Sequence, residues 1–409
     1  MSADLEVPLW PVHGTETLPW QQRSRGGTRD DRMMRAVDAS IPPLIAGLDF
    51  SAPTAMVTAS EEALVAVGRV DSSAAVHSSA LGRFLIRTES VASSKIERIS
   101  ASADDYARAI AGSRGNASAV SMVAATAALQ KLVDVVGERG EVLVDDVLEA
   151  HHALMRDDPI EQDYAGRFRD MQNWIGGSDH SPRGALYVPP APGRVDDLMR
   201  DLVAYLNRDD VPALVQASIA HAQFESIHPF TDGNGRIGRA LVSAALRRRG
   251  VTRHSVIPLA SGILARRDEY FDSLGAYRAG QPGSIVGLFV RSAEVAATEA
   301  WDSIERITAL PSEWATELRP RAGSAVARLL PLLFDHPVLD AAEVERLSGV
   351  GPVQTYAAID RLVEAGIMRE ITGRKRDRVW VASTLLAELD DLDRRIQAWM
   401  RAPEENGRG

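Results

Sequence analysis

The stretch His228-Pro229-Phe230-Thr231-Asp232-Gly233-Asn234-Gly235-Arg236-Ile237-Gly238-Arg239 decides how this chain is interpreted. Apolar residues at helical spacing precede it, and Pro229 keeps His228 out of helical geometry, so a helix should end there. A second helix should begin near Asn234 and end at the cations before Gly250. The stretch is therefore predicted to be a glycine-rich loop that joins two helices.

Such a loop has the chemistry of a phosphate site. The amides around Gly233 and Gly235 would meet an anion together with the positive end of the second helix dipole. Without a Cβ, these glycines let the backbone approach the anion closely. Arg236 and Arg239 lie three residues apart on that helix, so both can donate to phosphate oxygens from nearly one face.

The loop also carries a metal ligand and a base. Asp232 supplies a hard oxygen ligand suited to Mg²⁺, and the His228 imidazole can accept a proton near neutral pH. Taken singly, each residue has a commoner structural role: a histidine before proline, a turn glycine, a surface ion pair. Their order within twelve residues favours the functional interpretation.

The stretch resembles the signature of the Fic family, His-Pro-Phe-x-[Asp/Glu]-Gly-Asn-Gly-Arg-x-x-Arg, at every fixed position. Residues 173–176 and 185–190 resemble the flap of that family, a hairpin that aligns a target segment by β-augmentation. The resemblance covers about residues 45–300. It implies a mainly α fold: a Fic-type helical core with a small β-hairpin flap.

The resemblance implies an enzyme that transfers AMP from ATP to a Tyr, Thr or Ser hydroxyl of a target protein. His228 would be the base, and Asp232 would hold Mg²⁺. The implied nucleotide-phosphate site comprises Asp232, Gly233, Asn234, Gly235, Arg236, Gly238 and Arg239. Relatives that phosphorylate their target carry Lys where this chain has Gly235. A donor such as UTP or GTP stays open, because the loop reads phosphates rather than bases.

Further nucleotide or flap contacts are expected by position relative to the family. The candidates are Tyr187, Val188, Tyr270, Phe271 and Arg278. Tyr270 and Phe271 fall on a helical stretch, where aromatic side chains usually belong to the core.

An inhibitory segment is predicted upstream. Residues 93–98 resemble the inhibitory motif of the family, [Ser/Thr]-x-x-x-Glu-[Gly/Asn], with Ser93 and Glu97 at its fixed positions. A glutamate over the site could pair with Arg239, which would remove the partner of the γ-phosphate. Arg98 departs from the pattern, since the family has a small residue there. In some relatives this glutamate also positions a water that removes AMP.

The last third of the chain has its own pattern. We expect a helix over 324–334, a second helix capped by Asp340 and Glu343, a third over 352–366, strands at 367–370 and 378–381, and a last helix over 384–400. This order resembles a winged helix-turn-helix. The hairpin has a basic wing of Arg369, Arg374, Lys375, Arg376 and Arg378, which favours DNA, whereas Asp360 and Glu364 on the third helix favour protein docking or dimerisation.

The bulk composition limits the remaining choices. The chain has 409 residues, a net charge of −10 and no cysteine, so disulfides, thiolate catalysis and zinc-cysteine sites are excluded. We found no long apolar run and no signal peptide, and expect a cytoplasmic protein that is not membrane-bound, with a possible homodimer. The expected segments are an irregular lead (1–40), a helical extension (41–150), the catalytic core (151–310), the winged helix (320–383) and a final helix and tail (384–409). The alternative is a DNA-binding regulator with a nucleotide-sensing core.

Overall fold

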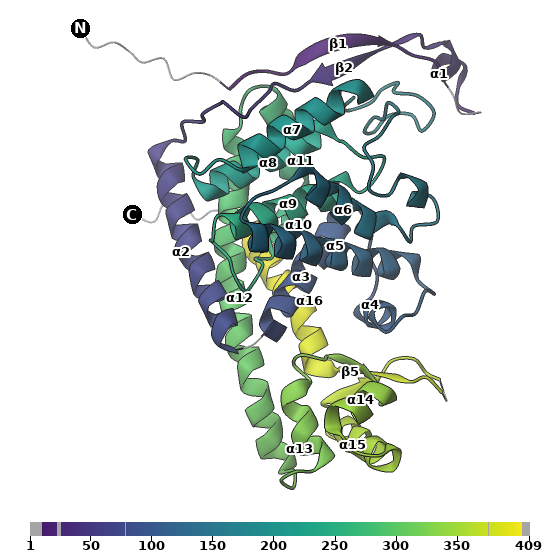
Figure 1. The fold of residues 1–409 in the computed structure, drawn as a ribbon, viewed down its shortest axis with the longest axis vertical. Coiled ribbons are helices and arrows are strands. Elements are labelled where there is room, and N and C mark those ends of the chain that lie inside the picture. Colours follow the sequence, from purple (N-terminus) through teal and green to yellow (C-terminus); the bar gives the residue numbers. More distant parts are fainter. Residues whose placement is uncertain (1–9, 23–25, 78, 375, 403–409) are drawn as a thin grey trace. The chain divides into compact units, whose positions relative to one another are not determined.

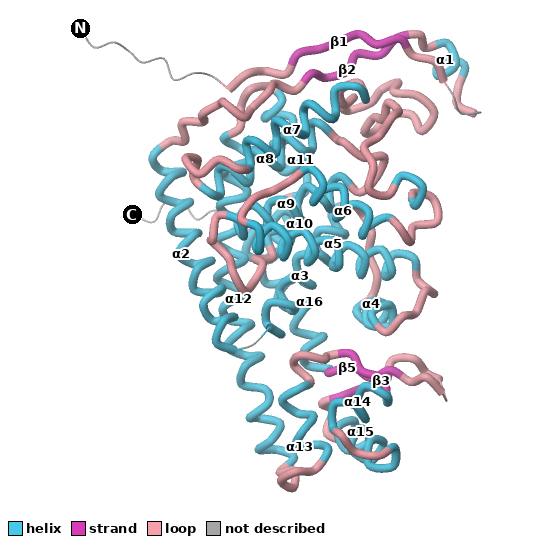
Figure 2. Tube along the Cα trace, viewed as in Figure 1, coloured by secondary structure: helices cyan, strands magenta, loops and turns pink. Residues whose placement is uncertain are grey.

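The computed structural model describes residues 10–22, 26–77, 79–374 and 376–402. They are mainly helical, as expected, with two small sheets (Figures 1 and 2). Two compact units interleave along the chain. The first joins the described residues up to Glu62 with Ala128–Val251 and Arg266–Arg291. The second joins Ala63–Ala127, Thr252–Ala265 and the described residues from Ser292 onward, so the units differ from the contiguous segments expected from sequence.

The first unit is built around a fully buried helix, α8 (Ala213–Ile227), which packs against α9 (Asn234–Arg248). Helix α8 has no polar face, so it can be covered on all sides, as expected for a central helix. Its other neighbours are α7 (Val195–Leu206) and α11 (Arg267–Arg278), while α6 (Val144–Met155) packs against α9. Single 3₁₀ turns lie at Gln162–Tyr164 and Pro192–Arg194.

The N-terminal segment corrects the expectation of an irregular lead up to residue 40. Strands β1 (Gly14–Pro19) and β2 (Ala36–Ile41) form an antiparallel pair, with the short helix α1 (Arg29–Met33) between them. In β2 the side chains of Val37 and Ala39 are buried while Ala36 and Asp38 are exposed, which is strand alternation. The Ser40 amide donates to the Val188 carbonyl (2.9 Å), so this hairpin lies against the predicted flap.

The second unit contains α3 (Ser79–Ile96), α4 (Ala103–Ile110), α10 (Leu259–Ala265) and α16 (Ser383–Arg401). Helix α3 packs against both α10 and α16. Three long helices run from one unit into the other: α2 (Thr54–His77), α5 (Ala117–Arg139) and α12 (Gly283–Leu318).

Helix α12 passes through Pro311, where a boundary was expected, and ends at Leu318, close to the second expected break. Ile307 and Trp314 lie two turns apart on one face, and both are buried. Their packing holds the helix despite the hydrogen bond that proline cannot donate.

Helix α5 is long and apolar enough to cross a bilayer by length and composition alone. No such segment was expected from the sequence. In the structure Ala119, Met122, Leu129 and Val133 of this helix are almost fully buried. Core packing therefore accounts for part of its apolar composition, since 44% of the apolar window is buried.

The C-terminal elements follow the expected order. They are α13 (Ala325–Leu329), a 3₁₀ turn (Leu330–Leu332), β3 (Val338–Asp340), α14 (Ala341–Ser348), α15 (Pro352–Glu364), β4 (Met368–Glu370) and β5 (Val379–Ala382). Asp340 and Glu343 form the expected capping box. Two details differ: α13 stops early at a turn that contains Pro331, and β3 was not anticipated. The antiparallel sheet has the order β3-β5-β4.

Candidate active site

The glycine-rich loop joins α8 to α9 as expected, and left-handed residues lie at both of its ends. His228 ends α8 with φ +49°, and Gly233 precedes α9 with φ +76°. The side chain of Asn234, the first residue of α9, closes the loop. Its Oδ1 accepts from the Phe230 amide and its Nδ2 donates to the Phe230 carbonyl, both at 2.9 Å. The loop is therefore held in one shape by its own side chain.

A histidine that sequence analysis did not single out supports this loop from α6. The His151 ring stacks on Phe230, with centroids 3.7 Å apart and planes 5° apart. Its Nδ1 accepts from the Gly166 amide (3.0 Å), so in the neutral ring Nε2 carries the proton and donates to the Asp232 carbonyl (3.2 Å). Burial lowers the pKa of His151 to about 4. In the sequence it is one of several polar residues of α6, and no local signal distinguishes it from the adjacent His152.

The base lies at the edge of the core. The His228 side chain is 18% exposed, and its Nδ1 is 3.8 Å from Oε2 of Glu225, which is 8% exposed. His228 thus has both limited access to solvent and an acidic neighbour one turn earlier in α8.

The cations of α9 lie within the molecule rather than on its surface. Arg236 is 6% exposed and Arg239 is 2% exposed. Arg236 Nη2 lies 3.5 Å from Oδ2 of Asp232. Both arginines are in the first two turns of α9, where the helix dipole adds to their positive charge.

Helix packing, as well as the motif, requires a residue without a side chain at Gly238. A Cβ there would lie 2.9 Å from both Glu225 Oε1 and Phe224 Cδ1. Real Cβ atoms almost never come that close, so α8 and α9 approach each other through this glycine. Gly233 is similar, because its Cβ would meet Met155 and Leu154 of α6.

Asp232 is the candidate metal ligand. Its side chain is 56% exposed, and one carboxylate oxygen accepts from the Gly233 amide (2.6 Å). No group of three or more metal-ligating side chains occurs within the described ranges. A single exposed carboxylate still fits Mg²⁺, which keeps several waters and combines one or two carboxylates with substrate phosphates.

The predicted flap is a hairpin closed by one bridge, between Ile175 and Tyr187. The Leu186 side chain is 86% exposed beside it. Asn173 Nδ2 donates to the Phe230 carbonyl (3.0 Å), which ties the base of the flap to the loop. Val188 is the flap residue that pairs with β2 through its carbonyl.

The other nucleotide candidates lie in different surroundings. The Tyr187 hydroxyl donates to the Ser226 carbonyl (2.6 Å), and the Arg278 guanidinium lies 3.5 Å above the Tyr187 ring, close to the end of α8. Tyr270 is 1% exposed and its hydroxyl is 2.9 Å from His221 Nε2, so it belongs to the core. Phe271 is 42% exposed under the Arg267 guanidinium.

The predicted inhibitory residues lie at the end of α3, in the second unit. Ser93 is buried and Glu97 is exposed just after the helix. The Ile99 amide donates to the Ser94 carbonyl (3.0 Å) and the Arg98 amide to the Lys95 carbonyl (2.9 Å), which is a Schellman motif. The pairing of Glu97 with Arg239 remains a prediction.

Comparison with known proteins gives one family and several relatives. The sequence profile of the Fic/DOC family matches residues 141–246. A protein adenylyltransferase of Caenorhabditis elegans is 33% identical over 141 residues, 34% of this chain and 24% of the relative. One of Drosophila erecta is 37% identical over 114 residues, 27% of this chain and 21% of the relative. The chain thus spans about a quarter of the length of these curated relatives.

A solved structure extends the likeness of fold. The crystal structure of a Fic family protein from Desulfovibrio desulfuricans aligns with a TM-score of 0.53 and 21% identity. The alignment covers 81% of this chain and 97% of that chain. At this identity the match establishes the fold alone.

Proposed function

Because the chain is a Fic family member with its Fic/DOC domain at residues 141–246, we propose that it is a protein adenylyltransferase. It transfers AMP from ATP to a Tyr, Thr or Ser hydroxyl of a target protein. One observation supports this most: the loop from His228 to Asn234 is held rigidly by Asn234 and His151, beside the N-terminus of α9. That arrangement combines a base with a phosphate site.

The residues fit an in-line displacement. His228 takes the proton of the target hydroxyl, whose oxygen then bonds to the α-phosphorus of ATP. The bond from that phosphorus to the β-phosphate oxygen breaks, and pyrophosphate leaves with its electron pair. The amides at the start of α9 stabilise the charge that develops on the phosphate oxygens, and Arg236 and Arg239 hold the β- and γ-phosphates.

Mg²⁺ is the expected cofactor, with Asp232 as its protein ligand. When bound, the ion neutralises phosphate charge. Asp232 is well placed for this because its backbone is fixed by His151 while its carboxylate stays exposed.

Glu97 is proposed to restrain the enzyme by pairing with Arg239, which would exclude the γ-phosphate from a productive position. The support is the exposed glutamate at a well-formed helix end, in the order that the family motif requires. The same glutamate could serve removal of AMP, which release of label from a modified target would reveal.

The test is intact-mass spectrometry of purified protein after incubation with ATP and Mg²⁺. We expect Glu97→Gly protein to gain AMP on itself at least about tenfold faster than wild type, and Glu97→Gly/His228→Ala protein to gain none. Parallel incubations with GTP and UTP establish the donor. No added mass with any nucleotide would refute the transferase activity, and equal labelling of wild type would refute only the restraint.

The C-terminal elements from 325 to 382 are proposed to form a winged helix that docks a protein. The exposed side of α15 supports docking over DNA: Val353 is 85% exposed and Tyr356 is 41% exposed, beside the acidic Asp360. Arg378 of the wing lies over the Tyr356 and Trp380 rings, so part of the basic charge is engaged within the module. Lys375 of the wing lies outside the described residues. Salt-sensitive binding of random duplex DNA would contradict the docking role.

A further inference from the structure

Arg169 is a buried arginine beside the proposed base, and the proposed mechanism gives it no role. It is 2% exposed. Its Nε donates to the His228 carbonyl (2.9 Å), its Nη2 to the Pro190 carbonyl (2.6 Å) and its Nη1 to the Met171 carbonyl (3.2 Å). Burial lowers its pKa to about 10, so it remains charged at neutral pH.

His228 needs such support because its backbone is unfavourable. Left-handed geometry is costly for a residue with a Cβ, and the conformation is further restricted before a proline. The His228 amide donates to the Phe224 carbonyl (2.8 Å), and its carbonyl accepts from Arg169. A residue with a strained backbone persists only where several contacts fix it, and the hydrogen bond from Arg169 is one of these contacts.

The same guanidinium holds the flap. Met171 precedes the first flap segment, Pro190 ends the second, and Arg169 donates to both carbonyls. The Arg169 amide also donates to the Pro229 carbonyl (2.9 Å), next to the base. One planar group therefore connects both ends of the flap with the backbone of His228.

We propose that Arg169 is a positioning residue for the transfer step, which sets the distance between a flap-bound target hydroxyl and the His228 imidazole. This rests on the proposed function, in which the flap aligns the target and His228 is the base. Lysine cannot replace the arginine, because one ammonium lacks the planar fork that spans three separated carbonyls.

The kinetic test uses Arg169→Lys in the Glu97→Gly background. The rate of self-labelling at saturating ATP should fall about 100-fold, the effect of misplacing a group by roughly 1 Å. The dissociation constant for ATP, measured by calorimetry, should stay within about twofold, because Asn234 and not Arg169 holds the phosphate loop. Loss of ATP affinity in parallel with the rate, or no loss of rate, would overturn the proposal.

Arg248→Lys is the matched control. The Arg248 side chain is 7% exposed in the first unit, and its Nη1 and Nη2 donate to the Arg208 and Asn207 carbonyls (3.1 and 2.6 Å), away from the loop. Nη2 also pairs with Asp209 (2.8 Å). Its labelling rate should stay within about twofold of the parent. An equal loss in both variants would mean that Arg169 acts only through general stability.

Hydrogen exchange tests the proposal without relying on activity. In Arg169→Lys protein, peptides covering 171–190 and 224–232 should exchange faster together, and in Arg248→Lys protein they should not. If Glu97→Gly protein labels nothing, the proposed function fails, and the exchange data alone decide whether Arg169 couples the flap to His228. Unchanged exchange in either peptide contradicts the coupling.

Discussion

At the glycine-rich loop, the types of neighbouring residues predict the backbone conformation only in part. Gly233 and His228 both adopt a left-handed backbone, although His228 carries a Cβ. The proline after His228 showed that the helix must stop there. It did not show that the residue would be held in a strained conformation by Arg169, which lies 59 positions away.

Gly238 gives a test at this scale. We expect Gly238→Ala to lower the free energy of unfolding by about 2 kcal/mol, because the new Cβ would press on Phe224 and Glu225 and push α8 from α9. Chemical denaturation measures it. Gly275→Ala in α11 is the control, since nothing lies within 4 Å of its Cβ, and it should be neutral or slightly stabilising. Equal stability of the two variants would argue against close packing at Gly238.

Among the elements, the end of α3 has a backbone that favours a small residue after Glu97, as in the inhibitory motif that this segment resembles. Arg98 is the residue that closes the Schellman motif, with φ +61°. Glycine or asparagine adopts this backbone readily, and arginine does so at a cost. The departure seen in the sequence thus concerns backbone strain rather than the charge of Glu97.

Arg98→Gly should therefore stabilise the protein by about 1 kcal/mol. Arg156→Gly is the matched substitution at the end of α6, where φ is −57°, and it should destabilise by about 0.5 kcal/mol because glycine gains freedom only in the unfolded chain. Thermal and denaturant unfolding of the two variants should show opposite signs. If both destabilise, the left-handed strain at Arg98 is unimportant.

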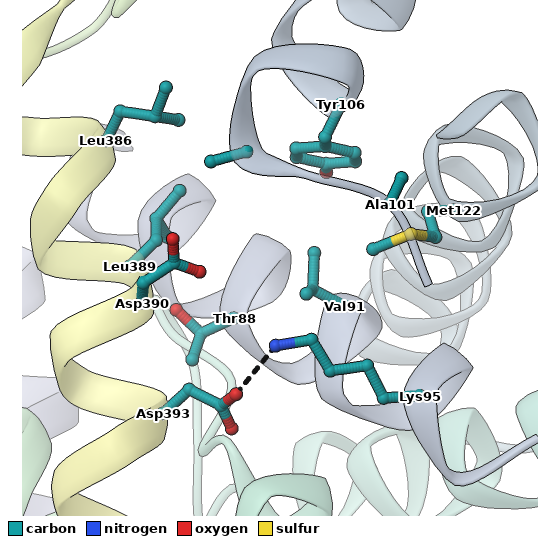
Figure 3. Close-up of a pocket in the computed structure, with 11 residues that line it drawn as sticks. Thr88, Val91, Lys95, Ala101, Tyr106, Met122, Leu386, Leu389, Asp390 and Asp393 are labelled. Carbon is teal, nitrogen blue, oxygen red and sulfur yellow. Dashed lines mark hydrogen bonds and ion pairs between the residues drawn. The ribbon is translucent and has the colours of Figure 1, made fainter. Parts of the chain in front are cut away.

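Helix α16 is tied to the same end of α3 by an ion pair. Lys95 Nζ lies 2.8 Å from Oδ2 of Asp393, whose side chain is 7% exposed (Figure 3). The pair lies at a cavity of about 30 Å³ that Val91, Tyr106 and Leu389 also line. Lys95→Met should cost about 3 kcal/mol, because it leaves a buried carboxylate uncompensated.

Asp391→Asn supplies the comparison on the same helix. Asp391 pairs with Arg394 on the surface of α16, where side-chain pairs contribute little, so its loss should cost less than about 0.5 kcal/mol. Urea denaturation distinguishes the two variants. A small effect of Lys95→Met would show that the carboxylate reaches water.

At the scale of the whole molecule, the C-terminal helix belongs to the second unit and is not an appended tail. Helix α16 buries Leu385, Leu386, Leu392 and Ile396. Its Arg395 bonds to Glu299 of α12 (2.9 Å), and Glu388 accepts from Ser303 of the same helix (2.6 Å). The helix begins at Ser383, close to the start expected at residue 384, and it lies within the second unit.

Truncation after Ala382 should therefore destabilise the second unit by several kcal/mol, on the order of 1.5–3 kcal/mol for each large apolar side chain exposed. Thermal unfolding and limited proteolysis would show it as a lower melting temperature and new cleavage within 63–127. Trp399→Ala, at a half-exposed position of α16, should leave both measurements near wild type. A truncated chain that melts like the full-length protein would contradict the assignment of α16 to this unit.

The sequence by itself determined the helical class, the loop between α8 and α9, and most C-terminal helix limits, including the Asp340–Glu343 cap. These depend on prolines, glycines and caps that act on backbone within a few residues. Only the tertiary structure decided the N-terminal hairpin, the passage of α12 through Pro311, and the contacts of His151 and Arg169 with the loop. Each of these depends on packing or hydrogen bonds between residues far apart in the chain, and neither periodicity nor local propensity records such partners.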